Sequence, residues 1–405
     1  MNIFKKNQLN LQSLPLLNNK HATTSNTRDI DRDVLDDDND LILDHPTSPK
    51  SPTSPKSQNF YPSSFLSSTK SKNSKSLKKH SSSIPSCLNV SISIQRDKFD
   101  ELNELESNRI IEGINDPYNS IWSLSSSLLK LNKNRNRYTN VSPYNKSRVH
   151  LPTIAETYSD YINASYINLK LPRSIKINKF IACQGPLTST INQFWTMCFN
   201  ESEKQNNEII IILMITPLIE HDMIKCDKYW PEYNEEWKFN EKNELDGLEF
   251  ENLSIKNVKE TSINNNEYLL TELELKNLHK TKKVYHFYYY NWSDAKIPPS
   301  SDPLINLSNH INELQQREIE NIPVPIVHCS AGVGRSGTFI AFDHLYKNRE
   351  YFKALIQNLS NNDHDKKKDI IYNIVYQLRS QRMMMVQTIH QYNWLYEAAK
   401  LIYKE

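Results

Sequence analysis

Cysteine is scarce in this sequence, and the few cysteines present form no framework. The 405 residues include 5 cysteines, an odd number at wide spacing, with no CxxC pair and no Cys/His cluster. This distribution excludes a disulfide-stapled secreted scaffold and a structural zinc module. We therefore expect no metal and no cofactor, and a reducing cytoplasmic or nuclear setting.

Long hydrophobic runs and an excess of one charge are also missing. No apolar run approaches the roughly 20 residues of a membrane-spanning helix, and the first residues are not followed by the apolar segment of a signal peptide. The 49 Lys and Arg residues nearly balance the 47 Asp and Glu residues, so no global field attracts nucleic acid. We expect a soluble protein with no membrane span and no nucleic-acid partner.

The first 96 residues lack the periodic apolar side chains that build a core. Ser, Asn, Lys, Asp and Pro dominate there, and such a segment cannot bury enough surface to offset its ordering entropy. We predict a disordered tail over residues 1–96 and a folded domain over residues 97–405. A basic-then-apolar motif in the tail resembles the docking peptide of MAP kinase partners, although a solvated tail is the simpler interpretation. Its residues are Lys5, Lys6, Leu9 and Leu11.

Apolar residues in the second part of the chain follow strand and helix patterns. Residues 209–214 are typical of a buried strand, and residues 284–292 of an aromatic strand. Prolines limit the pairing of a third apolar run, residues 322–327. Strands mixed with helices predict an α/β domain of about 300 residues. Helical spacing occurs over residues 99–131, in Phe339, Phe342 and Tyr346, and in Trp394, Ala398 and Leu401.

A glycine-rich loop, HCSAGVGRSG at residues 328–337, separates the third apolar run from a predicted helix. Its glycines allow a tight turn and bring backbone N–H groups close to a ligand. A helix beginning near Arg335 points its positive end at the same place, which favours an anion. These groups also favour the thiolate of Cys329, so its pKa should lie well below about 8.5. Because Arg335 suits two phosphate oxygens, the loop would hold a phosphate dianion above a nucleophile.

Two other interpretations of this loop carry less weight. Gly332, Gly334 and Gly337 match the GxGxxG dinucleotide fingerprint. That fingerprint expects an acidic residue about 20 positions later, where Gln357 stands. A buried cysteine is usually an inert small hydrophobe, but a histidine and a glycine-rich turn with an arginine flank Cys329. The catalytic interpretation is favoured.

The loop resembles the HCxxGxxRS/T signature of the tyrosine-specific, non-receptor protein tyrosine phosphatases, most closely their fungal members. Over residues 97–405, further stretches match the family in order. The resemblance implies a twisted mixed β-sheet flanked by helices, and hydrolysis of phosphotyrosine in proteins through a phosphocysteine, as part of intracellular signalling. The matching stretches are NRYTNVSPY (136–144), DYINASY (160–166), QGP (184–186), KCDKYWP (225–231) and QTIHQY (387–392).

The family implies a role for each residue of the loop. Cys329 would attack phosphorus, and Arg335 would clamp the phosphoryl oxygens. Ser336 would donate to the sulfur and help the thiolate leave, while His328 would tune the cysteine from behind. The remaining backbone amides of the cradle would belong to Ser330, Ala331, Gly332, Val333 and Gly334.

A phenolate leaving group with a pKa near 10 needs a general acid. Trp292 and Asp294 occupy the place of the family's mobile Trp-Pro-Asp loop, which makes Asp294 the expected acid. A lone loop aspartate is more often a turn residue, but this one follows an aromatic strand and precedes Cys329 by 35 positions. Gln387 would then place the hydrolytic water, with support from Gln391.

Residues around the loop would set selectivity and brace the site. Tyr138 would form an aromatic wall against the substrate ring, in a pocket deep enough for phosphotyrosine and too deep for phosphoserine. Asn140 would hold the substrate backbone. Glu220 and Lys225 match the family positions that brace Arg335 and the loop of residues 292–294, which we call the acid loop.

Three residues depart from the family pattern. Ser293 replaces the usual proline of the acid loop, which frees a backbone torsion and should alter loop closure. Asn140 stands where an aspartate is common, so we expect weaker binding of peptide. Met384 stands where some members have glycine, and its bulk should narrow a secondary phosphate site. Alternatives are a weakly catalytic phosphotyrosine-binding module, and a dual-specificity or lipid phosphatase.

Overall fold

The computed structural model describes the chain from residue 84 to residue 404 with five gaps. The expected MAP kinase docking motif and nearly all of the expected tail lie outside the described residues. No helix in the described part is long and apolar enough to cross a membrane. The gaps are residue 86 and segments 240–246, 249–251, 318–319 and 358–368.

The folded part begins earlier than the expected boundary at residue 97. Helix α2 (Ile92–Asn115) is capped by Ser91, whose Oγ accepts a hydrogen bond from the N–H of Ile94 at 3.3 Å. Leu88 and Val90, upstream of this helix, are buried. The sequence analysis missed them because they lie in a stretch rich in polar residues and do not follow the helical spacing that begins later, whereas tertiary packing still covers them.

The helical pattern expected over residues 99–131 divides into three elements. Helix α2 ends at Asn115 because Pro117 disfavours helical backbone in the residue before it. A short helix α3 (Ser125–Leu128) and a 3-10 turn η2 (Lys130–Arg135) follow.

Nine strands of the described segments form one mixed sheet, in the order β1-β2-β3-β11-β4-β10-β9-β8-β7. Strands β3, β11, β4 and β10 are parallel to one another, and the outer strands pair antiparallel. Their bounds are β1 (Arg148–His150), β2 (Tyr161–Lys170), β3 (Ile177–Cys183), β4 (Ile209–Met214), β7 (Glu236–Phe239), β8 (Leu253–Ile263), β9 (Tyr268–Lys276), β10 (Thr281–Tyr288) and β11 (Ile326–His328). Strands β5 (Ile219–Glu220) and β6 (Met223–Ile224) form a separate hairpin.

Strand β4 confirms the buried strand predicted at residues 209–214. Its side chains alternate between two cores, because Ile211 and Leu213 face one layer of helices while Ile210 and Ile212 face the other. The other two expected strands are shorter than predicted. The aromatic strand ends at Tyr288, and prolines confine the third to Ile326–His328.

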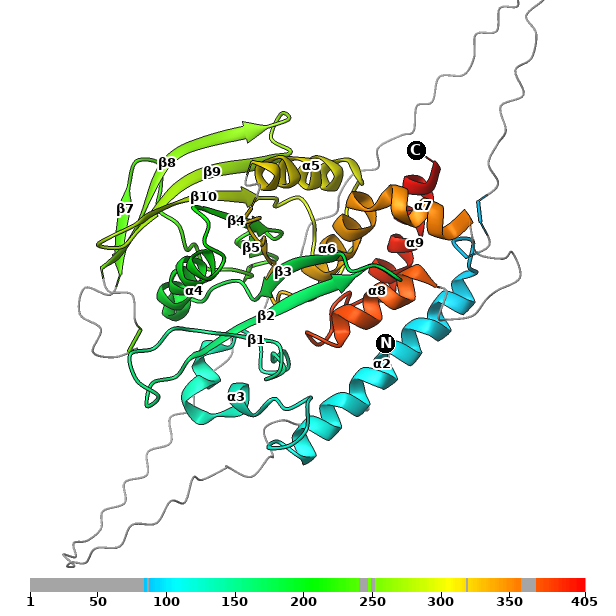
Figure 1. Cartoon of the computed structure of the whole chain (residues 1–405), viewed down its shortest axis with the longest axis horizontal. Coiled ribbons are helices and arrows are strands. Elements are labelled where there is room, and N and C mark those ends of the chain that lie inside the picture. Colours follow the sequence, from blue (N-terminus) through cyan, green and yellow to red (C-terminus); the bar gives the residue numbers. More distant parts are fainter. Residues whose placement is uncertain are drawn as a thin grey trace, which may run out of the picture. The chain divides into compact units, whose positions relative to one another are not determined.

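Helices cover both faces of the sheet. Helix α4 packs in one core, and α6, α8 and α9 pack in the other, with α2 along α8 and α9 (Figure 1). Phe339, Phe342 and Tyr346 are buried on one face of α6 as predicted, but Leu401 of α9 is 51% exposed. The remaining bounds are η3 (Thr188–Thr190), α4 (Ile191–Lys204), α5 (Asp302–Gln316), α6 (Gly334–Lys347), α7 (Arg349–Gln357), α8 (Ile370–Arg379) and α9 (Ile389–Lys404).

Candidate active site

The glycine-rich loop connects the central strand β11 to helix α6, which begins at Gly334. His328, the last residue of β11, is fully buried. Its Nδ1 lies 3.1 Å from the carbonyl oxygen of Cys329, so Nδ1 carries the proton and Nε2 accepts from the Tyr229 hydroxyl at 2.6 Å. Tyr229 then accepts from Nε2 of His286 at 2.7 Å. Burial lowers the pKa of His328 to about 4, so this histidine is neutral.

The backbone of the loop is shaped by a glycine and a buried arginine. Gly332 has a φ of +70°, and a Cβ placed there would lie 1.9 Å from the carbonyl oxygen of Cys183. Arg382, which is fully buried, donates to the carbonyl oxygens of Gly332 and Ala331 at 2.9 Å each. Because these carbonyls face Arg382, the loop can turn N–H groups toward its inner side.

Cys329 lies in this loop with only 3% of its surface exposed. Burial by itself raises the pKa of the thiol. The Arg335 guanidinium, the Ser336 hydroxyl and backbone N–H groups of Ser336 and Gly332 outweigh burial, and the net pKa is below its ordinary value. Within the described residues, Ser336 Oγ is buried and makes no hydrogen bond to nitrogen or oxygen. Its hydroxyl is therefore left to interact with the sulfur.

Arg335 is 1% exposed and holds the acid loop against the glycine-rich loop. Its Nη1 donates to the carbonyl oxygen of Trp292 at 2.7 Å, and its Nη2 donates to Asp294 Oδ1 at 3.3 Å. Glu220 Oε2 lies 3.5 Å from Nη1. The Nε of Arg335 is buried and has no hydrogen-bond partner among the described residues. This donor is available to an anionic ligand.

Asp294 is held beside the loop by two residues of the β5–β6 hairpin and its flank. Lys225 Nζ lies 2.9 Å from Asp294 Oδ2, and Glu220 Oε1 accepts from the N–H of Asp294 at 2.8 Å. Burial raises the pKa of the Asp294 carboxyl. Lys225 and Arg335 lower it by a larger amount, so the net pKa is below its usual value. Trp292 is fully buried and donates from Nε1 to the carbonyl oxygen of Lys296 at 2.9 Å, which anchors the loop.

Tyr138 stands at the side of the same loop. Ser330 Oγ donates to the carbonyl oxygen of Lys225 at 2.6 Å, so the Tyr138 hydroxyl, 2.8 Å away, donates to Ser330 Oγ. The ring is half-buried, whereas Asn140, two residues later, is exposed. Tyr138 is therefore linked to the glycine-rich loop through the residue after Cys329.

Gln387 and Gln391 approach the start of helix α6. Gln387 Oε1 would lie 3.0 Å from a Cβ at Gly334, and Gln391 Nε2 would lie 3.3 Å from it. Gln391 is fully buried, and its Oε1 accepts from the N–H of Gln387 at 3.0 Å. Its Nε2 donates to the carbonyl oxygen of Lys296 at 3.3 Å, so Gln391 also contacts the acid loop.

The three departures from the family pattern have different surroundings. Ser293 is exposed on the acid loop, and Asn140 is exposed beside Tyr138. Met384 has a φ of +60°, a backbone conformation that costs a non-glycine residue about 1–2 kcal/mol. Its side chain is partly buried against the core, and its effect on a secondary phosphate site stays a prediction.

Two buried arginines were missed at the sequence level. Arg382 binds the glycine-rich loop as described above, and Arg379 donates to the carbonyl oxygens of Met385 and Val386 at 3.0 Å each. Both follow a helical pattern near a chain turn, where arginine is usually exposed. The sequence signal that could have indicated these two arginines is their position a few residues before Gln387.

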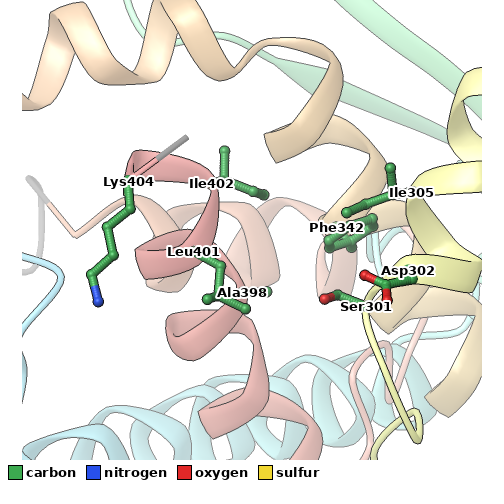
Figure 2. A pocket seen from close by; sticks show the side chains of 8 residues that line it. All are labelled: Ser301, Asp302, Ile305, Phe342, Ala398, Leu401, Ile402 and Lys404. Atoms are coloured by element: carbon green, nitrogen blue, oxygen red, sulfur yellow. The ribbon is translucent and has the colours of Figure 1, made fainter. Parts of the chain in front are cut away.

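A separate cavity of about 300 Å³ lies between the start of α5, helix α6 and the end of α9 (Figure 2). Its lining contains none of the predicted site residues, and Leu401 is part of it. In the described part of the chain, no group of three or more His, Cys, Asp or Glu side chains could hold a metal ion.

Sequence and structure comparisons point to one family. The Protein-tyrosine phosphatase family profile matches residues 132–400. Tyrosine-protein phosphatase 1 of Saccharomyces cerevisiae is 38% identical over 326 residues, covering 75% of this chain and 93% of the relative. Tyrosine-protein phosphatase 1 of Schizosaccharomyces pombe is 32% identical over 303 residues, covering 74% of this chain and half of that relative.

Solved structures share the fold. A structure described as the structural basis of the PTPN18 fingerprint on distinct HER2 tyrosine phosphorylation sites superposes with a TM-score of 0.61 at 24% identity. The match covers 79% of this chain and 100% of that one. The mixed sheet and the loop between its central strand and a helix thus define the cysteine-phosphatase class of fold. Within that class, the chain belongs to the protein-tyrosine phosphatase family, and the predicted similarity to fungal members is confirmed.

Proposed function

We propose that this protein hydrolyses phosphotyrosine in protein substrates in two steps, through a phosphocysteine on Cys329. One observation carries the proposal: the buried Nε of Arg335, which has no hydrogen-bond partner among the described residues, lies in the same loop as a thiol whose pKa is lowered. A phosphoryl group would satisfy this donor and lie above the nucleophile. Family membership supports the same substrate class.

In the first step, the Cys329 thiolate attacks phosphorus and the bond from phosphorus to the tyrosine oxygen breaks. Asp294 gives its proton to the departing phenolate. Lys225 and Arg335 face Asp294 and lower the pKa of its carboxyl. A bound phosphate dianion would take over Arg335 and add negative charge nearby, so the pKa of Asp294 would rise on substrate binding and favour the protonated acid.

In the second step, water attacks phosphorus and the bond from sulfur to phosphorus breaks. Gln387 would place the water, and Asp294, now a carboxylate, would accept its proton. The Ser336 hydroxyl would stabilise the departing thiolate. His328 would remain neutral, and its Nδ1–H would orient the Cys329 carbonyl.

Substrate selectivity would come from Tyr138 and the depth of the loop. Cys329 is nearly fully buried, so a phosphate on a long aromatic side chain reaches it and phosphoserine does not. The Tyr138 ring would pack on the substrate ring while its hydroxyl holds Ser330. Because the mechanism needs a reduced thiolate, we place the protein in a reducing intracellular setting, where it would act in signalling.

Rates on para-nitrophenyl phosphate and on a phosphotyrosine peptide test the proposal. We expect wild type to turn over both, Cys329→Ser to be inactive, and Asp294→Ala to lose about 10²–10⁴-fold in kcat. Acid quenching during turnover should trap phosphate covalently on Cys329. A wild type no faster than Cys329→Ser would instead indicate a phosphotyrosine-binding module, the alternative that Ser293 motivates. Equal rates on phosphoserine peptides would contradict the selectivity.

A further inference from the structure

Residues 384–386, directly before Gln387, have an unfavourable backbone. Met384 and Val386 both have a φ of +60°, although neither is glycine. Such conformations persist only where surrounding contacts impose them. The segment therefore needs partners elsewhere in the fold, and the structure shows three.

The first partner is Glu106 of helix α2, which is 7% exposed. Its Oε1 accepts from the N–H of Met384 at 2.7 Å, across 278 positions of sequence. This bond fixes the first of the two left-handed residues. Burial raises the pKa of the Glu106 carboxyl, which Arg379 and the N–H of Met384 partly oppose.

The second partner is Arg379, whose guanidinium is buried between helix α2 and the segment. It donates to the carbonyl oxygens of Met385 and Val386 and to Asn103 Oδ1 at 2.7 Å, and its Nη1 lies 3.7 Å from Glu106 Oε2. Nε and Nη2 of the guanidinium therefore bind the segment, while Nη1 binds helix α2.

The third partner is the glycine-rich loop itself. The N–H of Val386 donates to the carbonyl oxygen of Val333 at 3.2 Å. A Cβ at Gly337 would lie 2.5 Å from the nitrogen of Val386, so helix α6 and the segment are in close contact there. The segment is held between α2 and the loop, and Gln387 follows it toward Gly334.

We propose that Glu106 is a positioning residue for phosphocysteine hydrolysis: with Arg379, it imposes the left-handed backbone at Met384 that aims the Gln387 amide at the attacking water. This inference rests on the proposed function. It assigns Glu106 mainly to the second step, because the Met384 N–H that Glu106 binds lies three residues before Gln387, and Gln387 acts only in that step.

Rapid-quench kinetics on para-nitrophenyl phosphate separate the two steps. In Glu106→Ala we expect release of the first para-nitrophenol at close to the wild-type rate. Steady-state turnover should then fall by roughly 10- to 100-fold, since misplacement of about 1 Å costs that much. A burst near one equivalent and accumulated phosphocysteine should result. The matched control is Glu104→Ala, an exposed residue of the same helix, which should behave as wild type.

Rescue distinguishes positioning from general stability. Glycine adopts a positive φ without strain, so Met384→Gly in the Glu106→Ala background should restore much of the steady-state rate. If Glu106→Ala does not fold, Glu106→Gln keeps an acceptor for the Met384 N–H and should show a smaller burst of the same kind.

Two outcomes would overturn the inference. One is a parallel loss of burst rate and steady-state rate without rescue by Met384→Gly, which would make Glu106 a purely structural residue. The other is turnover unchanged from wild type in Glu106→Ala. A wild type that releases no para-nitrophenol would overturn the proposed function itself, and is distinguishable from both.

Discussion

Lys225 Nζ lies 2.9 Å from Asp294 Oδ2, and this ion pair joins the hairpin flank to the acid loop. Lys225 is 6% exposed while Asp294 is 45% exposed, so the anchored partner is the lysine. The pair holds the carboxyl near Arg335 and at the same time favours its charged form. The geometry that places Asp294 therefore also opposes its protonation, so the proposed role as an acid needs the bound substrate to raise its pKa.

Lys225→Met should move the basic limb of the kcat–pH profile to higher pH. Without the ammonium group, the carboxylate of Asp294 loses a favourable neighbour, so the pKa of Asp294 rises and the protonated acid survives to higher pH. We also expect kcat at the optimum to fall, by less than in Asp294→Ala, because Glu220 still holds the N–H of Asp294. Lys228→Met, which changes a lysine paired with Glu232 instead, is the control. A basic limb that stays in place or moves to lower pH would contradict this assignment.

Ser293→Pro should raise kcat by roughly 2- to 5-fold, which about 0.4–1 kcal/mol would produce if proline restricts the open acid loop as it restricts an unfolded chain. Ser293 is exposed, and the bond that its carbonyl accepts from the N–H of Lys296 at 3.3 Å would survive. Proline fixes φ and should favour the closed acid loop. Steady-state kinetics on para-nitrophenyl phosphate measure the effect, with Ser293→Ala as the control. A slower proline variant would show that the loop needs the freedom of serine.

Iodoacetamide at pH 6.5 should alkylate Cys329 ahead of the other cysteines. Its pKa is lowered. Burial raises the pKa values of the other four, namely Cys87, Cys183, Cys198 and Cys226. Mass spectrometry of peptides during inactivation would show whether loss of activity follows modification of Cys329, and inorganic phosphate should protect it. Equal labelling of half-buried Cys87 would count against a thiolate in the loop.

Low doses of hydrogen peroxide should inactivate the enzyme reversibly. A thiolate oxidises first to a sulfenic acid, which thiols reduce again. Activity measured before and after incubation with dithiothreitol tests this, and permanent loss at low dose would be the contrary result.

Buried neutral histidines should make the fold less stable in acid. Burial lowers the pKa of His328 to about 4 and that of His344 to about 3, whereas both titrate near 6.5 in the unfolded chain. Between the folded and the unfolded pKa, the unfolded state binds more protons than the folded state. Each histidine therefore lowers the free energy of unfolding by up to about 1.4 kcal/mol per pH unit as pH falls below about 6.5. Urea denaturation at pH 7.5, 6 and 5 should show this slope. His344→Gln should flatten it, and an unchanged slope in that variant would contradict the account for His344.

The sequence alone determined the features that depend on local pattern and residue chemistry. A run of apolar residues specified β4, because a strand buried on both faces needs no polar positions. An anion-binding loop was predicted from the glycines, Cys329 and Arg335, because a glycine-rich turn at the start of a helix directs backbone N–H groups toward an anion. Resemblance to a family then supplied Asp294 and Gln387, whose residue types alone would not have distinguished them from turn residues.

Tertiary structure decided what those residues contact. Arg382, Arg379 and Glu106 look like ordinary charged residues of a helix or its end in the sequence, and only packing buries them against the glycine-rich loop and the segment before Gln387. The same packing buries Leu88 and Val90, which precede the helical spacing of the sequence. One physical reason explains all of these cases. Periodicity shows which side of a helix or strand is buried, whereas the partner of a buried charge lies far away in sequence and is brought close only by the fold.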